Sequence, residues 1–231
     1  MAIKAVAFDA YGTLFDVYAV TSRLEACCPG KGGAIAQLWR DKQIEYSRLI
    51  SLSDPTASGS QYYEPFWDLT VKALDYALQR FDIRLGDADI QSILDQYHSL
   101  DAFEENAAVL RALKSAGIRT AIVSNGDPAM LNGAVRAAGF DALIDDVVSV
   151  DAVRHFKTTP QAYGLVEQTL GLKPCDVLFV SSNGWDVMGA GWFGFQTCWI
   201  NRAGLPAETI GPRPLHEGHD LNVVLTVLGR Q

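Results

Sequence analysis

The chain has 231 residues, a formal net charge of −8 at pH 7 and hydrophobic residues at 48% of its positions. This length is enough for one large domain or two modest ones, and the composition is that of a folded globular protein. So much negative charge disfavours a nucleic-acid partner, because the phosphate backbone is itself anionic. An anionic substrate would therefore have to meet local cations.

The apolar run at the N-terminus ends at Asp9, before the hydrophobic region of a signal peptide would be complete. No stretch approaches the roughly 18 apolar residues that cross a bilayer, so we expect a cytoplasmic protein with no membrane partner. The four cysteines, Cys27, Cys28, Cys175 and Cys198, have no CxxC spacing. Reduced thiols are expected, and neither a zinc site nor a redox motif is indicated.

The first predicted element is a strand over residues Ile3 to Phe8. The run is apolar and does not alternate, which is typical of a strand buried on both faces of a parallel sheet. A loop from Asp9 to Thr13 follows at once. An acidic residue therefore stands directly after a buried strand.

The pattern changes to helical periodicity between about Asp16 and Leu100. Apolar residues recur at helical spacing in two series, Ile35, Leu38 and Trp39, and then Phe66, Leu69, Leu74 and Leu78. Strand-like runs are absent from this block. The turn-rich stretch from Ser51 to Ser60 is predicted to be an exposed connection between two helices. We interpret the block as a helical insertion after the first strand.

The remainder of the chain alternates between helix and strand. A helix is predicted over Ala107 to Ala116, stopped by Gly117. The further predicted strands are Thr120 to Ser124, Asp146 to Val150 and Asp176 to Ser181. Residues 201–219, which include three prolines, are predicted to be loop, and a short helix is expected near Leu221 to Leu228.

This alternation predicts right-handed βαβ units and a parallel sheet with helices on both faces. Each apolar strand ends in a polar cluster, formed by Asp9, by Ser124, by residues 149–151 and by residues 181–183. In open α/β sheets, ligands bind outside the carboxyl ends of the strands. We therefore expect the four clusters to meet in one crevice.

An aspartate at the end of a buried strand is suited to nucleophilic attack, although Asp9 alone could simply cap a loop. Four segments follow one another in order: FDAYGTLF at residues 8–15, SNG at residues 124–126, Lys157, and SSNGWD at residues 181–186. Together they resemble the four motifs of the haloacid dehalogenase superfamily. The resemblance covers essentially the whole chain.

The resemblance implies an α/β fold with two parts. Residues 1–15 and 101–231 would form a Rossmann-like core with a parallel sheet flanked by helices, and residues 16–100 an inserted helical-bundle cap. Most of the superfamily are magnesium-dependent phosphohydrolases, with a second aspartate two residues after the nucleophile. Tyr11 occupies that position here. A phenol is a poor replacement for a carboxylic acid, and fewer carboxylates hold a divalent cation less well, although Tyr11 could also serve only in packing.

The segment WRDKQIEY at residues 39–46 looks like the arginine helix of the L-2-haloacid dehalogenase branch. Members of that branch convert (S)-2-haloalkanoic acids to (R)-2-hydroxyalkanoic acids and halide, with no metal and no cofactor. The resemblance makes Asp9 the nucleophile and Arg40 the principal halide ligand. Without it, Arg40 would be read as a solvated helix residue.

The resemblance also assigns the groups that would bind the substrate. Asn125 resembles the second halide donor, and Trp185 the aromatic edge beside the halide. Ser124 matches the hydroxyl that binds the substrate carboxylate, assisted by backbone N–H groups near Ala10 and Tyr11.

Other matched positions would support the nucleophile. Thr13 matches a hydrogen-bond partner of Asp9, and Lys157 matches the ammonium that keeps Asp9 ionised and oriented. Tyr163, on the helix opened by Thr159-Pro160, matches a support for the lysine and the substrate. The set that positions Asp9, Lys157 and the hydrolytic water is Ser181, Asn183 and Asp186. Without the motifs, Lys157 would be a surface residue and Tyr163 a core aromatic.

Three side chains are candidates for the apolar wall around the alkyl group of the substrate, namely Ile44, Phe66 and Trp185. Core packing is the simpler interpretation of Phe66. His155, two residues before the motif lysine, is expected on a surface loop, with electrostatic tuning of the site as the alternative.

Two other functions fit the same motifs. One is a phosphohydrolase with an atypical acid/base position, and the other is a catalytically silent member that binds a ligand or serves as a scaffold. The joint presence of Asp9, Ser124, Lys157 and Asp186 argues against the second. The favoured expectation is a metal-independent, homodimeric dehalogenase whose partners are a small halogenated carboxylic acid and a halide ion.

Overall fold

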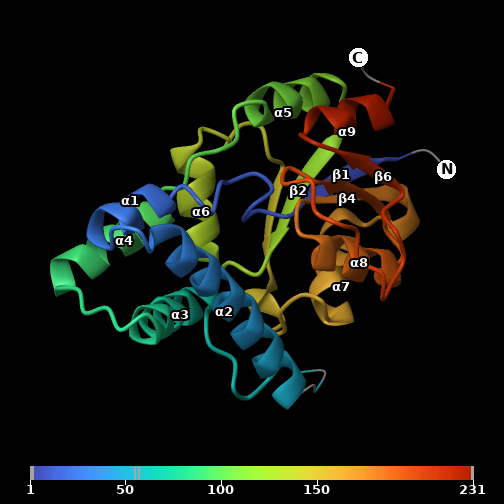
Figure 1. Ribbon diagram of the computed structural model, residues 1–231. Coiled ribbons are helices and arrows are strands. Elements are labelled where there is room, and N and C mark those ends of the chain that lie inside the picture. The colour runs from blue at the N-terminus through green and yellow to red at the C-terminus, as the bar shows by residue number, and fades with distance from the viewer. Residues whose placement is uncertain (1–2, 55, 57, 230–231) are drawn as a thin grey trace.

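Figure 1 shows the computed structural model, which describes residues 3–54, 56 and 58–229. The strands are β1 (Ala5–Phe8), β2 (Arg119–Ser124), β3 (Asp146–Ser149), β4 (Val177–Ser181), β5 (Gln196–Ile200) and β6 (His216–Gly218). The helices are α1 (Thr21–Cys27), α2 (Gly32–Ser53), α3 (Phe66–Arg80), α4 (Asp87–His98), α5 (Asn106–Ser115), α6 (Pro128–Ala137), α7 (Pro160–Leu170), α8 (Gly184–Phe193) and α9 (Asn222–Val227), with short 3-10 turns η1 (Val150–Ala152) and η2 (Pro174–Asp176). None of the described helices combines the length and the apolar composition that crossing a membrane requires.

The described strands form a six-stranded parallel sheet in the order β3-β2-β1-β4-β5-β6. β1 lies between β2 and β4, with Ala5 opposite both Arg119 and Val177. The strand order reverses between β1 and β4, which is where open α/β sheets form a ligand crevice. The predicted Rossmann-like α/β fold is confirmed.

Helices cover both faces of this sheet, as Figure 1 shows for α5 and α9 on one side and α7 and α8 on the other. Val6 and Phe8 point to the face covered by α5, α6 and α9, whereas Ala5 and Ala7 point to the face covered by α7 and α8. All four β1 side chains are fully buried. Burial on both faces is the reason that this strand is apolar without alternation.

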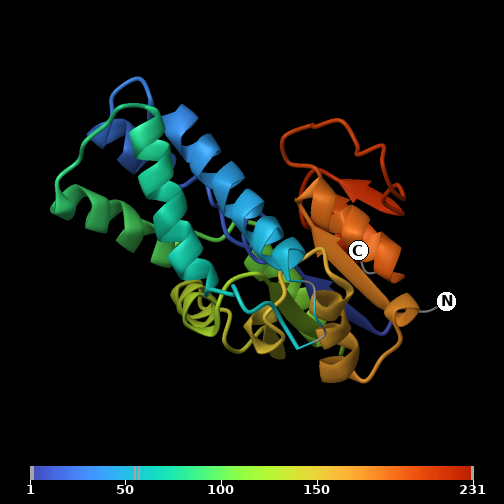
Figure 2. The same ribbon diagram turned by 90° about the horizontal axis from the view of Figure 1, so that it is seen from below.

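The helices α1 to α4 form a bundle beside the sheet, and α2 runs along the boundary between the two (Figure 2). α2 packs on α3 through buried polar contacts, since Trp39 Nε1 donates to the carbonyl of Thr70 at 2.8 Å. The chain leaves and rejoins the sheet at neighbouring points, because the N–H of Asp16 donates to the carbonyl of Asp101 at 2.8 Å. The bundle is thus inserted between β1 and α5.

Two expectations about connecting segments are wrong. Residues 201–219 are not all loop, because β6 forms there by pairing with β5. The stretch from Ser51 to Ser60 is not simply an exposed connection, because α2 continues to Ser53 and both Ser51 and Ser60 are buried. The N–H of Phe156 donates to Ser51 Oγ at 2.9 Å, so this stretch packs on the sheet half of the chain. Residues 55 and 57 lie outside the described residues.

Candidate active site

Asp9 lies at the point where the strand order reverses. It follows β1 directly, and its N–H donates to the carbonyl of Val180 in β4 at 2.9 Å. The strands on either side end at Ser124 and Ser181. The carboxyl ends of three adjacent strands therefore bring together side chains that are distant in sequence, as predicted. The expectation that residues 149–151 join the same crevice is wrong, because Ser149 and Asp151 line a separate pocket with residues of α6 and α7.

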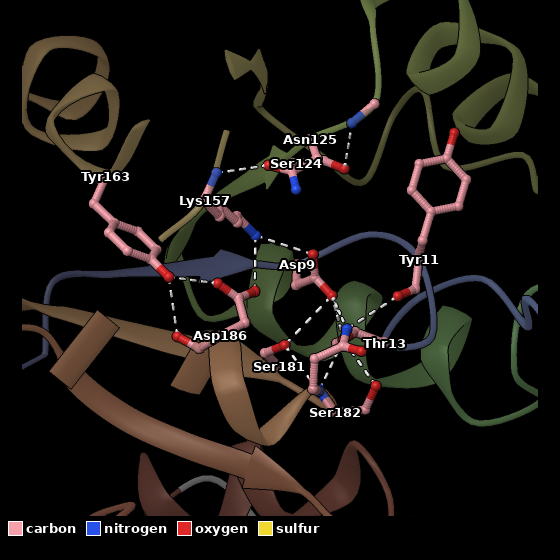
Figure 3. Close-up of polar contacts among 12 residues, drawn as sticks. Asp9, Tyr11, Thr13, Ser124, Asn125, Lys157, Tyr163, Ser181, Ser182 and Asp186 are labelled. Atoms are coloured by element: carbon pink, nitrogen blue, oxygen red, sulfur yellow. Dashed lines mark hydrogen bonds and ion pairs between the residues drawn. The ribbon is translucent and has the colours of Figure 1, made fainter. Parts of the chain in front are cut away.

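Both oxygens of the Asp9 carboxylate accept hydrogen bonds (Figure 3). Oδ1 accepts from Lys157 Nζ at 3.0 Å. Oδ2 accepts from Thr13 Oγ1 at 3.0 Å, Ser181 Oγ at 3.3 Å and Asn183 Nδ2 at 2.8 Å. These four donors set the orientation of a carboxylate that is only 5% exposed.

The Lys157 ammonium connects two carboxylates. Nζ lies 3.0 Å from Asp9 Oδ1 and 2.8 Å from Asp186 Oδ2. Burial lowers the pKa of Lys157, but attraction to Asp186 and Asp9 outweighs this effect, so the pKa is raised. A buried positive charge therefore stands permanently beside Asp9.

Asp186 is fully buried and is bound from two sides. The Tyr163 hydroxyl donates to Oδ1 at 2.7 Å, and Lys157 donates to Oδ2. Desolvation raises the pKa of Asp186 to about 6, although Lys157 acts in the opposite direction. Burial, reinforced by the negative charge of Asp186, raises the pKa of Tyr163 well above its ordinary value. Tyr163 therefore remains a hydrogen-bond donor.

The loop after β2 supplies two polar side chains. Asn125 Oδ1 accepts the N–H of Lys157 at 2.8 Å, so the amide offers its own N–H donors to a ligand. Ser124 Oγ accepts the N–H of Gly126 at 3.1 Å, which leaves the hydroxyl hydrogen for another acceptor. A Cβ at Gly126 would lie 2.8 Å from the Tyr11 ring, so this turn requires glycine for close packing.

These groups surround a space of about 10 Å³, which we call the inner cavity. It is lined by Asp9, Tyr11, Ser124, Asn125, Lys157 and Trp185 from the sheet half and by Arg40, Ile44 and Phe66 from the bundle. All nine residues are among those predicted from the sequence. A volume of this size holds about one water molecule. A larger ligand therefore requires part of the wall to move.

Arg40 reaches from α2 to the loop after β1. Its Nη2 donates to the carbonyl of Tyr11 at 3.2 Å, and Asn183 Nδ2 donates to the same carbonyl at 3.2 Å. The Tyr11 ring stacks on Tyr97 with 5.9 Å between centroids. Burial raises the pKa of Tyr11 well above its ordinary value, so the phenol keeps its proton.

Ala10 and His155 do not line the inner cavity. Ala10 is buried next to Asp9, and its carbonyl accepts backbone N–H groups from residues 13–15. The expectation of a surface histidine is wrong, because His155 is only 1% exposed. Its Nε2 contacts the carbonyl of Thr56, since the connection between α2 and α3 packs over the ring.

Sequence reasoning missed the contribution of Ser182. Its backbone N–H donates to Thr13 Oγ1 at 2.8 Å, which directs the threonine hydroxyl toward Asp9. Any residue type can supply a backbone donor, so no side-chain pattern marks this position. The only signal is its place within the fourth motif, between Ser181 and Asn183.

Within the described ranges, no three His, Cys, Asp or Glu side chains are grouped closely enough to hold a metal ion. The carboxylates of Asp9 and Asp186 are instead joined through Lys157. Such an arrangement, at the strand-order reversal of a parallel sheet, defines an α/β enzyme with a candidate carboxylate nucleophile.

Comparison with known proteins shows to which family of α/β enzymes the chain belongs. A family model described as a haloacid dehalogenase-like hydrolase matches residues 3–194. The chain therefore belongs to the haloacid dehalogenase-like hydrolase family, as the motifs predicted.

Named relatives are similar over nearly the full chain. An (S)-2-haloacid dehalogenase of Pseudomonas sp. (strain YL) is 41% identical over 223 residues, which cover 96% of this chain and 93% of that protein. A crystal structure of an L-2-haloacid dehalogenase has 49% identity and a TM-score of 0.96, covering 99% of this chain and 100% of its own. The L-2-haloacid dehalogenase of Xanthobacter autotrophicus with chloropropionic acid covalently bound has 37% identity and a TM-score of 0.88, with 98% of each chain covered.

Proposed function

We propose that the chain hydrolyses short-chain (S)-2-haloalkanoic acids to (R)-2-hydroxyalkanoic acids and halide, with Asp9 as the covalent nucleophile. One observation carries the proposal: four donors orient the Asp9 carboxylate at the wall of a cavity that also contains the N–H donors of Arg40 and Asn125. The names of the relatives agree with this activity. The covalently bound chloropropionic acid of the Xanthobacter protein supports a covalent intermediate.

In the first step, an Asp9 oxygen attacks C2 of the substrate from the side opposite the halogen. The new C–O bond forms as the carbon–halogen bond breaks, and its electron pair leaves with the halide. Arg40 and Asn125 donate hydrogen bonds to the departing halide, and the edge of the Trp185 ring lies beside it. A halide needs such donors but no proton, so the step requires no general acid.

The remaining lining residues would hold the substrate in position for this attack. The Ser124 hydroxyl, with backbone N–H groups near Ala10 and Tyr11, binds the substrate carboxylate. Ile44 and Phe66 contact its alkyl group. Ile44, Phe66 and Trp185 form the apolar part of a lining that is otherwise polar or charged.

In the second step, water attacks the carbonyl carbon of the Asp9 ester. The acyl C–O bond breaks, one water proton passes to the product oxygen and the other is released, so Asp9 is regenerated. Ser181, Asn183 and Asp186, together with Lys157, position the carboxyl group and the water. Because the second step does not touch C2, one inversion results.

We also propose that no metal takes part, since the Lys157 ammonium supplies positive charge between Asp9 and Asp186. A phosphohydrolase would need a proton donor for its leaving alcohol at Tyr11. Burial raises the pKa of that phenol, which disfavours the role.

The chain would work as a core of residues 1–15 and 101–231 with a cap of residues 16–100. The hydrogen bond between Asp16 and Asp101 supports these boundaries, because it brings the two ends of the inserted segment together. We further propose that the protein is cytoplasmic and that it forms a homodimer. Light scattering on the purified protein would test the dimer.

The nucleophile can be identified with oxygen-18. Purified protein with a chelator should release chloride from (S)-2-chloropropionate and form (R)-lactate. In a single turnover in oxygen-18 water, the label should enter the Asp9 carboxyl group and not the lactate, because water attacks the acyl carbon. Mass spectrometry of the peptide that contains Asp9 measures this incorporation.

The matched variant is Asp9→Asn, which keeps the size of the side chain and removes its charge. It should lose halide release, with its mass checked to exclude deamidation. Label in the lactate after one turnover would disprove the ester on Asp9. Turnover of a chromogenic phosphate with magnesium, in the absence of halide release, would favour the phosphohydrolase.

A further inference from the structure

A second, larger space lies on the outer side of the inner cavity. It has a volume of about 780 Å³ and lies between α2, the loops after β1 and β4, and residues 200–205; we call it the outer cleft. Arg40, Ile44 and Trp185 line both the outer cleft and the inner cavity. These three side chains therefore form the partition between the two spaces.

The partition must open for a substrate to reach Asp9. The inner cavity has room for about one water molecule, and a halogenated carboxylic acid is much larger. Two members of the partition, Arg40 and Ile44, belong to the long helix α2, whereas Trp185 stands in the first turn of α8. A group that contacts Trp185 from the outer cleft could therefore influence the opening.

Arg48 is such a group. Residues 40, 44 and 48 are spaced four apart on α2, so their side chains follow one another along one side of the helix. Unlike the other two, Arg48 lines only the outer cleft. Its guanidinium carbon lies 5.0 Å from the centre of the Trp185 ring, which is within cation–π range. Arg48 thus stands on the outer side of the partition.

The charge of Arg48 is available to a ligand. It makes no ion pair with any carboxylate in the described part of the chain. Arg202, another cation of the outer cleft, pairs with Glu105 at 2.7 Å. Arg40 already donates to a backbone carbonyl.

The acidic groups of the outer cleft have partners of their own. Glu45 pairs with Lys42 at 2.8 Å. Asp41 accepts from Gln37 Nε2 at 2.9 Å, and Asp16 accepts the N–H of Tyr18 at 2.9 Å. Their hydrogen-bonding capacity is therefore partly used, whereas the Arg48 guanidinium stacks on the Trp185 ring and has Glu208 as a nearby negative charge with which it forms no ion pair.

A local cation matters because the protein as a whole repels its substrate. The net charge of −8 creates an unfavourable field for any carboxylate. A positive group inside a cleft raises the local concentration of anions and the rate at which they associate, and salt screens this effect.

We propose that Arg48 is a positioning residue that captures the carboxylate of the incoming haloacid in the outer cleft and passes it to the inner cavity. A carboxylate bound to the guanidinium competes with the Trp185 ring for the same cation. The cation–π contact then weakens, and the indole can turn away from the partition. The identity of the anion rests on the proposed function, whereas the capture of a carboxylate at Arg48 does not.

The test compares Arg48→Gln with the parent protein at about 10 mM and 500 mM salt, where charges are screened over very different distances. For (S)-2-chloropropionate, kcat/KM at low salt should fall about three- to tenfold through KM, with kcat within twofold. The difference should largely disappear at high salt. Arg48→Lys should restore most of the low-salt value, because it restores the charge.

Arg84→Gln is the matched control, since Arg84 is exposed between α3 and α4 and its loss changes the net charge equally. Association of 2-methylpropanoate, a carboxylate without a leaving group, is followed by stopped-flow tryptophan fluorescence and should slow in Arg48→Gln alone. This binding measurement tests whether Arg48 captures a carboxylate, even if the protein releases no halide. Equal behaviour of the Arg48 and Arg84 variants, or a salt-independent loss in kcat, would overturn the inference.

Discussion

Asp186 is a fully buried carboxyl group whose pKa is raised toward neutrality. Desolvation raises its pKa to about 6, while the contacts with Lys157 and Tyr163 act in the opposite direction. Below this pKa the carboxyl group is protonated, and Lys157 loses one of its two negative partners. We therefore expect dehalogenation to decline on the acid side with an apparent pKa near 6.

Replacing Tyr163 by Phe should move this acid limb to higher pH. The variant lacks the 2.7 Å hydrogen bond to Asp186 Oδ1, and that bond lowers the pKa of Asp186. Without it the carboxyl group takes up its proton at higher pH, so activity is lost earlier on acidification. The pH profile of kcat/KM between pH 4.5 and 9 measures the shift.

Tyr97→Phe is the control for loss of a buried tyrosine hydroxyl, because the Tyr97 hydroxyl contacts Gln43 in the helical bundle and not Asp186. Its acid limb should stay in place. A Tyr163→Phe profile that is lower at every pH but unshifted would mean that Asp186 is not the group whose titration limits activity.

At the level of single residues, the sequence predicted the groups that carry recognisable motifs. Asp9, Lys157 and Asp186 occupy motif positions, and the structure joins them in one network. Arg48 and Ser182 were not found. Arg48 depends on a contact with a ring in α8, and Ser182 acts through its backbone, so neither leaves a local pattern.

At the level of elements, β1 to β4 were predicted from the sequence, whereas β5 and β6 were not. β1 is apolar throughout, and β4 is apolar up to Ser181, because helices cover both faces of these strands. β6 has only three residues, His216, Glu217 and Gly218, and none is a strong strand former. It exists because β5 offers a partner for its backbone, which is information that a local pattern does not contain.

Asp127 connects two elements that are far apart in sequence, and its loss should destabilise both. Oδ1 accepts the N–H groups of Ala129 and Met130 at the start of α6, and Oδ2 accepts the N–H of Trp67 in the first turn of α3. Asp127→Ala leaves these donors unpaired. The free energy of unfolding should fall by about 1–3 kcal/mol in urea titrations.

Asp127→Asn serves as the comparison, because its amide oxygen can still cap α6. We expect it to recover a large part of the stability lost in Asp127→Ala. If the two variants were equally destabilised, the charge of Asp127 and not its hydrogen bonds would be responsible.

At the scale of the whole molecule, the candidate site belongs to neither half alone. The bundle contributes Arg40, Ile44 and Phe66 to the inner cavity, and the sheet half contributes the nucleophile and its partners. The two halves also meet at Ser51, which accepts the N–H of Phe156 at 2.9 Å. A ligand in the inner cavity therefore contacts both halves and should stabilise them together.

This coupling predicts the response to 2-methylpropanoate, which has the shape and charge of a haloacid but cannot react. At a concentration about 100-fold above its Kd, binding adds about 2.7 kcal/mol to the free energy of unfolding. For a chain of this length, that corresponds to a rise in Tm of roughly 5–10 °C.

Hydrogen exchange should slow both in α2 and in the loop after β1, because the ligand contacts the two segments at once. The neutral amide 2-methylpropanamide should have little effect, since it lacks the charge that the cationic groups of the site bind. Protection of the loop after β1 without protection of α2 would mean that the bundle does not close over the ligand.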